Sequence, residues 1–389
     1  MARALLGGVL ALLVLAGRPA GQEAAKSSDP GPIFRLSVSL VQLDAVVTDR
    51  KGHHVTDLGP SDFLVLQDGR PQPVTAVAYI RAEEPLLDDT GAPQVSRPTS
   101  PRDARRVIAV VIDDSRMSFE SIARTRTVLR RFVDEQLLPD DLVCFVTTSS
   151  HLGTQWQFTY GRAELKAAAA RLRFSLWNAS TRSAMDPIDG SLLGGQSEID
   201  ATLERTFAIN ALNRIIDVVN AVRELPGRKT IVLVSEGFAM FGPGDYHSLI
   251  RDVMEQVVDR ANRAGVVVYA VDPRGLVFTG LSAADNPNSM RAALDGMAMR
   301  NAALRETQDG LRFVAGETGG FAVVNNNDLR AALGRVMADQ SGYYLIGYQP
   351  PRDTFNRNAR PDFHRLKVKV TRKGLAVRSR AGFYPFATE

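Results

Sequence analysis

Three stretches of the chain differ in the spacing of their apolar residues. Between Phe34 and Ile80, and again after Ser341, apolar and polar residues alternate in short runs, which is typical of antiparallel strands with one buried face. From Arg105 to about Asp339, short apolar runs are followed by segments whose apolar residues recur every three or four positions. This middle stretch therefore predicts an α/β unit with a mostly parallel sheet covered by helices on both faces.

Six strands are expected in the middle stretch, at residues 107–112, 142–147, 155–159, 230–234, 266–271 and 321–324. Because strand-like runs lie at both ends of the chain, with the α/β unit inserted between them, we expect the two end segments to pack together as a β-sandwich-like domain. The predicted boundaries are 33–82 for the N-terminal strand segment, 83–104 for a proline-containing linker, 105–339 for the α/β domain and 341–386 for the C-terminal strand segment.

Residues 1–22 have the pattern of a secretory signal peptide. Arg3 precedes an apolar run of 13 residues from Ala4 to Ala16, and small residues follow it. A membrane-spanning helix needs about 20 apolar residues, and no other run in the chain approaches that length. We predict an exported protein, secreted or periplasmic, with no membrane span once the signal is removed. Retention of the signal as an N-terminal anchor is the alternative.

Composition narrows the function classes. The 389 residues are 44% hydrophobic and 23% charged, as in ordinary globular proteins. The net charge is +4, and removal of Arg3 and Arg18 with the signal leaves 45 Lys and Arg against 43 Asp and Glu, or +2, which gives no electrostatic reason to expect nucleic acid as a partner. The single cysteine, Cys144, lies in an apolar run and is expected to be a buried, inert thiol.

Candidate chemistry follows the first strand of the middle stretch. The apolar run 107–112 leads directly into Asp113, Asp114 and Ser115. In open α/β sheets, ligands bind at the carboxyl ends of the strands. Carboxylate and hydroxyl oxygens suit hard cations such as Mg²⁺, Mn²⁺ or Ca²⁺. The alternative is that Asp113 and Asp114 cap the helix that follows.

Motifs of the common enzyme classes are missing from the sequence. Ser235-Glu236-Gly237 lacks the leading glycine of a nucleophile elbow, no phosphate-binding glycine motif occurs, and no histidines have the spacing of zinc ligands. With no nucleophile, base or cofactor motif, we predict that the chain is not an enzyme, and a hydrolase is the least favoured function.

The ordered set of short motifs resembles that of von Willebrand factor type A domains, and the mature chain as a whole resembles the bacterial secreted group called acidobacterial VWFA-related proteins. The matching segments are 105–107, 113–115, 138–141, 158–159, 225–229, 234–237, 269–275, 318–320 and 343–348. The resemblance implies a doubly wound, Rossmann-like sheet of six strands, in which 155–159 supplies a short antiparallel edge strand. It also implies a metal-ion-dependent adhesion site.

In the family, that site consists of an Asp-x-Ser-x-Ser turn, a threonine from a later loop and an aspartate after the fourth strand, and a carboxylate of the partner protein completes it. Asp113 and Ser115 match the first two positions of the turn, but Met117 replaces the third. Glu236 stands where the family has aspartate and is longer by one methylene. The resemblance therefore implies a degenerate site with weakened or water-bridged binding of a divalent cation.

The other positions of this site are less closely matched. Thr206 is the candidate for the loop threonine, with Thr202 and Thr181 as alternatives. Asp114 and Asp272 are candidates for outer-shell acids. For Asp272 the favoured role is a cap of the turn before Pro273.

Two long connections, 174–204 and 276–300, are expected to carry function because loops of this length are uncommon in compact domains. Trp177 and Phe278 in these connections are candidate partner-binding residues, unless they fold back over the edge of the sheet. We predict an exported protein-binding or adhesion module with a protein ligand. The alternative is a non-catalytic envelope scaffold with a vestigial metal site.

Overall fold

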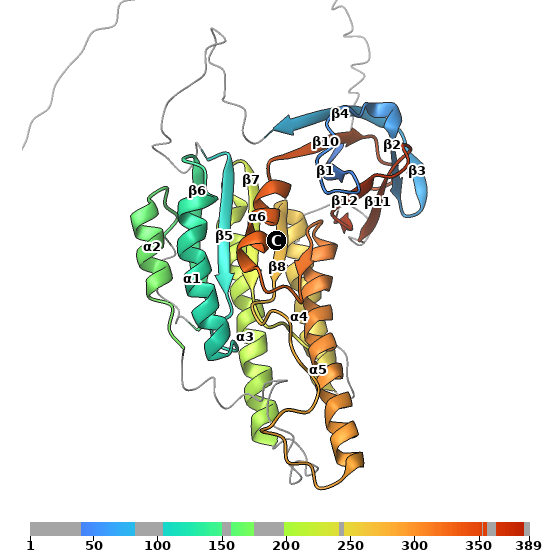
Figure 1. Cartoon of the computed structure of the whole chain (residues 1–389). Helices are drawn as coiled ribbons and strands as arrows, with labels where there is room; N and C mark the ends of the chain where they lie inside the picture. Colours follow the sequence, from blue (N-terminus) through green and yellow to red (C-terminus); the bar gives the residue numbers. More distant parts are fainter. Residues whose placement is uncertain are drawn as a thin grey trace, which may run out of the picture. The chain divides into compact units, whose positions relative to one another are not determined.

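A computed structural model describes residues 40–81, 104–149, 157–174, 198–240, 245–351, 353–355 and 363–384 (Figure 1). The predicted signal 1–22, nearly all of the predicted linker, Trp177 and Thr181 lie outside these residues. Within them, none of the helices is both long and apolar enough to cross a membrane.

A five-stranded parallel sheet forms the centre of the α/β unit (Figure 1). Its order is β6-β5-β7-β8-β9, with β5 at Arg106–Ile112, β6 at Asp141–Thr147, β7 at Arg228–Val234, β8 at Val266–Val271 and β9 at Ala322–Val323. All seven residues of β5 are buried, as expected for a strand covered on both faces. The predicted α/β class and mostly parallel sheet are therefore confirmed, with five strands.

Of the predicted sixth strand, 155–159, the structure describes residues 157–159, and these form one bridge. Thr159 pairs antiparallel with Val143 on the outer edge of β6, through N–O distances of 3.0 and 2.9 Å. Within the described residues this is the extent of the antiparallel edge, and positions 155 and 156 lie outside them.

Helices cover both faces of the sheet, because alternate residues of each strand point to opposite faces. Ile108, Val110 and Ile112 share one hydrophobic core with the first set of helices, whereas Val107 and Ala109 lie in a second core with the other set. The first set is α1 (Phe119–Glu135), α2 (Arg162–Ala170) and α6 (Leu329–Asp339), and the second is α3 (Glu198–Arg223), α4 (Asp245–Ala264) and α5 (Met290–Glu317).

Strands from the two ends of the chain pair with one another in two antiparallel sheets. One sheet has the order β12-β1-β10-β4, from Ala376–Ser379, Val41–Thr48, Gly342–Tyr348 and Val74–Arg81. The other has the order β13-β11-β2-β3, from Gly382–Phe383, His364–Val370, Phe63–Gln67 and Arg70–Gln72. A 3₁₀ turn at Pro60–Asp62 leads into β2. Both sheets contribute side chains to one core that includes Tyr344, Tyr348 and Phe63.

Candidate functional site

The candidate site lies where β5, β6 and β7 end. In the parallel register, Ile112 is aligned with Thr147 of β6 and with Val234 of β7. The residues that follow these three strands therefore emerge at the same edge of the sheet, which is where open α/β sheets bind ligands.

Asp113 is fully buried at this edge and is surrounded by hydroxyl groups. Its Oδ1 accepts hydrogen bonds from Ser115 Oγ and Thr148 Oγ1, each at 3.0 Å, and its Oδ2 accepts one from Ser235 Oγ at 2.8 Å. We call Asp113, Ser115, Thr148 and Ser235 the Asp113 cluster. The three hydroxyls satisfy a buried carboxylate that would otherwise be costly to remove from water.

Three oxygens of the Asp113 cluster form a nearly equilateral triangle. Asp113 Oδ1 lies 3.0 Å from Ser115 Oγ and 3.0 Å from Thr148 Oγ1, and these two hydroxyl oxygens are 3.1 Å apart. Ligands at 2.0–2.1 Å from an octahedral Mg²⁺ have neighbours at about 2.8–3.0 Å, whereas ligands at 2.3–2.6 Å from Ca²⁺ are about 3.3–3.7 Å apart. The triangle therefore has the dimensions of one face of an octahedron around an ion of the size of Mg²⁺.

Ser235 occupies its position because the chain turns sharply after β7. Gly237 has a φ of 95°, and its N–H donates to Ser235 Oγ at 2.9 Å. A Cβ at Gly237 would lie 2.2 Å from the carbonyl oxygen of Thr307. Only glycine fits this turn, which aims the Ser235 hydroxyl at Asp113.

Glu236 lies at the same edge but its carboxylate has a different partner. Glu236 Oε1 accepts a hydrogen bond from the Ser118 N–H at 2.8 Å, at the N-terminus of α1. The Ser118 side chain caps the same helix by accepting from Ser121 N–H. A carboxylate is favourable at this position because unpaired N–H groups and the helix dipole make it electropositive.

The structure therefore brings Asp113, Ser115 and Glu236 to one edge, as the sequence predicted. It also corrects the alternative that Asp113 and Asp114 cap the first helix. Ser118 and Glu236 cap α1 instead. The Ser118 hydroxyl accepts from the Ser121 N–H, and the Glu236 carboxylate accepts from the Ser118 N–H, so each satisfies a different N–H group at the start of the helix.

Asp114 lies beside the cluster and is held by the loop after β6. Its oxygens accept from Ser149 N–H at 2.9 Å, from Ser149 Oγ at 2.5 Å and from Thr148 Oγ1 at 3.3 Å. Burial raises the pKa of the Asp114 carboxyl above its ordinary value, and the nearby Asp113 adds to this effect. Asp114 is thus next to the candidate ligands, sharing Thr148 with them.

The hydroxyl that joins Asp113 from a later loop comes from Thr148, which the sequence reasoning missed. Thr206 has a different role from the one predicted, because α3 begins at Glu198 and places Thr206 inside the helix. The exposed Thr206 hydroxyl donates to the Thr202 carbonyl at 2.9 Å, a common bond of helical threonines. The available signal for Thr148 was the hydroxyl-rich run 147–150, which begins at the last residue of β6.

The remaining residues of the turn after β5 face the interior. Met117, at the third position of the Asp-x-Ser-x-Ser pattern, is 1% exposed and packs in the core beneath α1. The guanidinium of Arg116 donates to the Gly237 carbonyl at 2.7 Å and pairs with Glu204 at 3.4 Å. These contacts tie the turn to the loop after β7 and to α3.

Asp272, predicted as an outer-shell acid or a turn cap, caps its turn. It accepts from the Arg274 N–H at 3.0 Å and forms a bidentate ion pair with the Arg274 guanidinium at 2.9 and 2.8 Å. Gln308 also donates to it at 3.2 Å. The structure therefore favours the capping alternative for this carboxylate.

Phe278 lies in an exposed apolar loop after β8. Phe278 and Leu276 are each 68% exposed and Leu281 is 44% exposed. We call 276–281 the apolar loop. Arg300 of α5 holds this loop, because its guanidinium donates to the Gly280 carbonyl at 2.9 Å and pairs with Asp285. Most of the Phe278 side chain is thus open to solvent, and its ring lies beside Gly280 of the same loop.

Histidine, cysteine and carboxylate side chains are the usual metal ligands in proteins besides hydroxyls. In the part of the chain that the structure describes, no three of them gather as a ligand set. The candidate ligands at the edge of the sheet are the Asp113 carboxylate and the hydroxyls of Ser115 and Thr148, and such hard oxygen donors suit Mg²⁺.

Comparisons with known proteins give little further information. No protein-family model matches the chain, and no curated protein matches it. One solved structure with some similarity is that of an aerotolerance-related membrane protein from Bacteroides fragilis with multiple mutations to serines. It is 13% identical with a TM-score of 0.33, over 60% of this chain and 98% of that chain. A likeness at this level carries no conclusion about function.

Proposed function

We propose that this chain is a protein-binding module of the von Willebrand factor type A kind, and that it binds a divalent cation of the size of Mg²⁺ at the Asp113 cluster. The observation that supports the cation is the triangle of Asp113 Oδ1, Ser115 Oγ and Thr148 Oγ1, with edges of 3.0, 3.0 and 3.1 Å. These edges match one octahedral face around Mg²⁺.

Asp113, Ser115 and Thr148 would hold the ion, after the two hydroxyl hydrogens rotate away from Asp113. Ser235 donates to the other oxygen of Asp113 and so fixes the orientation of the carboxylate, as outer hydrogen-bond partners of metal ligands do. The carboxylates of Asp114 and Glu236 lie at the same edge, and their negative charge favours a cation there.

A bound ion would supply open coordination positions for a carboxylate of a partner protein. The apolar loop adds a surface for the same partner, because exposed Leu276, Phe278 and Leu281 have the apolar and aromatic character of interface anchors. Met290 and Leu294, in the first two turns of α5, are also exposed, at 76% and 57%. No catalytic role is proposed for any of these residues.

Calorimetry with matched threonine variants tests the cation. We expect Mg²⁺ to bind the wild-type chain, Thr148→Val to weaken binding at least about tenfold, and Thr206→Val to leave it unchanged. The reason is that Thr148 Oγ1 belongs to the triangle, whereas Thr206 Oγ1 donates to its own helix. Circular dichroism would verify that both variants fold.

The cation proposal is wrong if wild-type protein takes up no Mg²⁺ or Mn²⁺, or if Thr206→Val loses binding while Thr148→Val keeps it. The alternative function is then an envelope scaffold with a vestigial site. That alternative is supported by the complete burial of Asp113, whose oxygens are already satisfied by three hydroxyls. In a scaffold, Asp113→Ala would lower stability without changing cation uptake.

Export of the mature protein remains a prediction from residues 1–22. Fractionation of the cells that make this protein, with mass spectrometry of its N-terminus, would test it. A secreted or periplasmic location and a new N-terminus near residue 22 are expected.

A further inference from the structure

The hydroxyl of Thr148 lies between two carboxylates. Its Oγ1 is 3.0 Å from Asp113 Oδ1 and 3.3 Å from Asp114 Oδ1, and its single hydrogen can be donated to either oxygen. The shorter distance favours Asp113 as the acceptor. Asp114 Oδ1 is thus a second acceptor for the same hydrogen, and it does not belong to the triangle of candidate ligands.

Binding of a cation would change the acceptor of this hydrogen. A hydroxyl binds a cation through a lone pair of its oxygen, so its hydrogen must point away from the ion. If Asp113 Oδ1 and Thr148 Oγ1 are two corners of one octahedral face, a hydrogen on the 3.0 Å line between them would lie beside the ion. The partial positive charge of the hydrogen is repelled there, and the Thr148 hydroxyl needs another acceptor.

Asp114 Oδ1 completes the hydrogen bonds of Thr148 in that arrangement. The hydroxyl has one hydrogen and two lone pairs. With the hydrogen directed to Asp114, one lone pair accepts from the Ser115 N–H at 3.4 Å, and the other is left for an ion. Thr148 and Asp114 are each 7% exposed, so a protein oxygen has to supply the acceptor that bulk water would supply at a surface.

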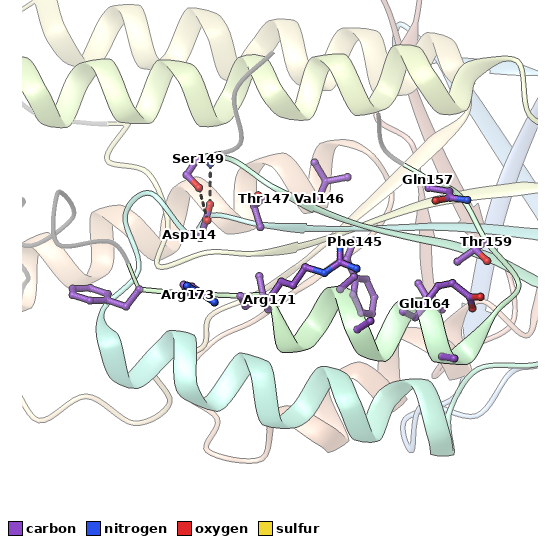
Figure 2. Close-up of a pocket in the computed structure, with 16 residues that line it drawn as sticks. Asp114, Phe145, Val146, Thr147, Ser149, Gln157, Thr159, Glu164, Arg171 and Arg173 are labelled. Atoms are coloured by element: carbon purple, nitrogen blue, oxygen red, sulfur yellow. Dashed lines mark hydrogen bonds between the residues drawn. The ribbon is translucent and has the colours of Figure 1, made fainter. Parts of the chain in front are cut away.

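Ser149 holds the Asp114 carboxylate in the required orientation. Figure 2 shows Asp114 and Ser149 joined by hydrogen bonds, which are those from Ser149 N–H to Oδ1 at 2.9 Å and from Ser149 Oγ to Oδ2 at 2.5 Å. Two bonds to different oxygens fix the plane of the carboxylate. Because Ser149 directly follows Thr148 in the chain, the same short segment sets the positions of the donor and of its second acceptor.

We propose that Asp114 is a positioning residue of the cation site. Its Oδ1 accepts the hydrogen of the Thr148 hydroxyl when the cation binds, and so directs a lone pair of Thr148 Oγ1 towards the ion, as outer hydrogen-bond partners of metal ligands do. This inference rests on the proposed cation site. It goes beyond a general effect of negative charge, because it requires an acceptor oxygen at one particular place.

Calorimetry with Mg²⁺ on the full chain separates the acceptor from the charge. Asp114→Asn removes the charge but keeps an oxygen beside Thr148, because the Ser149 N–H needs an acceptor at Oδ1 and the Ser149 hydroxyl can accept from the new amide. Asp114→Ala removes both. Asp217→Ala is the control for loss of a carboxylate, since Asp217 is 48% exposed and pairs with Arg214 on α3. Circular dichroism compares the fold of each variant with that of the wild-type chain.

We expect Asp114→Ala to bind Mg²⁺ at least about tenfold more weakly than Asp114→Asn, and Asp217→Ala to bind it like the wild-type chain. The two Asp114 substitutions are also made in Thr148→Val, which has no hydroxyl hydrogen to place. In that background their affinities should differ by less than about twofold. Electron paramagnetic resonance of free Mn²⁺ extends the comparison to the weakest binders.

Equal affinities of Asp114→Ala and Asp114→Asn would overturn the inference, and so would a difference between them that persists in Thr148→Val. The second result would mean that Asp114 acts on the site by a route other than the Thr148 hydroxyl. In both cases the wild-type chain still binds Mg²⁺, so the cation site itself stands. Absence of Mg²⁺ and Mn²⁺ binding by the wild-type chain would instead overturn the cation site and this inference together.

Discussion

The hydroxyl groups around Asp113 come from three different loops, after β5, β6 and β7. Ser115 could be predicted from the sequence because it belongs to a short motif directly after a strand. Thr148 could not, because its place beside Asp113 depends on the register of β6 against β5. Sequence spacing could not distinguish Thr148 from Thr206, Thr202 or Thr181, since each is a hydroxyl residue far along the chain from Asp113.

A residue-scale prediction concerns His54. Its Nε2 lies 3.0 Å from the Ala338 carbonyl oxygen and its Nδ1 lies 3.3 Å from the Tyr79 hydroxyl, which suits a neutral ring that donates at one nitrogen and accepts at the other. Burial lowers the pKa of His54 below its ordinary value of 6.5, and the charges of Arg228 and Arg378 lower it further.

A lowered pKa means that the folded protein binds the second ring proton of His54 less tightly than the unfolded chain does. The stability that depends on neutral His54 is therefore fully present above pH 6.5 and is lost as the pH falls below it. We expect wild-type protein to lose more free energy of unfolding than His54→Gln between about pH 7.5 and about pH 5.5. Urea denaturation at the two pH values measures this. Equal losses in both proteins would show that His54 does not contribute.

At the scale of elements, the strands were the most predictable part. The five strands of the parallel sheet were expected within two residues of their observed bounds, because strands buried on both faces must be continuous apolar runs. The starts of α3 and α5 were missed. Leu203 and Thr206 in the second and third turns of α3 are exposed, and so are Met290 and Leu294 in the first two turns of α5. These turns therefore lack the apolar period that contact with the sheet imposes.

The apolar loop gives a prediction at this scale. Asp285 and Arg300 form an ion pair whose side chains are 0% and 9% exposed, and Asp285 also accepts from Ser282 N–H. Asp285→Asn leaves the Arg300 charge without its partner, which for buried pairs costs about 3–5 kcal/mol. We expect backbone amide exchange to become faster across residues 276–289.

Asp295→Asn is the matched control, because the Asp295 side chain is 53% exposed and its ion pair with Arg291, at 3.8 Å, lies on the surface of α5. Hydrogen–deuterium exchange with mass spectrometry would compare the two variants with the wild-type chain. If Asp285→Asn exchanges no faster than Asp295→Asn in this segment, the ion pair does not hold the loop.

For the whole molecule, the alternation patterns indicated strands at both ends of the chain, but they could not indicate which strands pair. The structure pairs β1 with β10 and β12, and β2 with β11, so each of the two antiparallel sheets combines N- and C-terminal residues. Such pairs are set by contacts between residues about 300 positions apart, which periodicity alone does not encode.

An antiparallel edge was expected at 155–159 and Thr159 pairs antiparallel with Val143, but the length of this edge could not be predicted from the pattern. The run 155–159 has strand-like composition, but its length as a paired strand depends on how many residues meet β6, and Thr159 with Val143 is the pairing that the described residues contain. The α/β class, the order of elements and the edge that carries the candidate site followed from the sequence, whereas the identity of the third triangle oxygen required the three-dimensional register.

The most direct measurement of the central claim is a crystal structure of the full chain grown with Mn²⁺, in which anomalous scattering locates the metal. Mn²⁺ replaces Mg²⁺ at octahedral oxygen sites. The account predicts an anomalous peak at about 2.0–2.3 Å from Asp113 Oδ1, Ser115 Oγ and Thr148 Oγ1. Absence of a peak at this triangle at saturating Mn²⁺, with the three oxygens still hydrogen-bonded to one another, would contradict it.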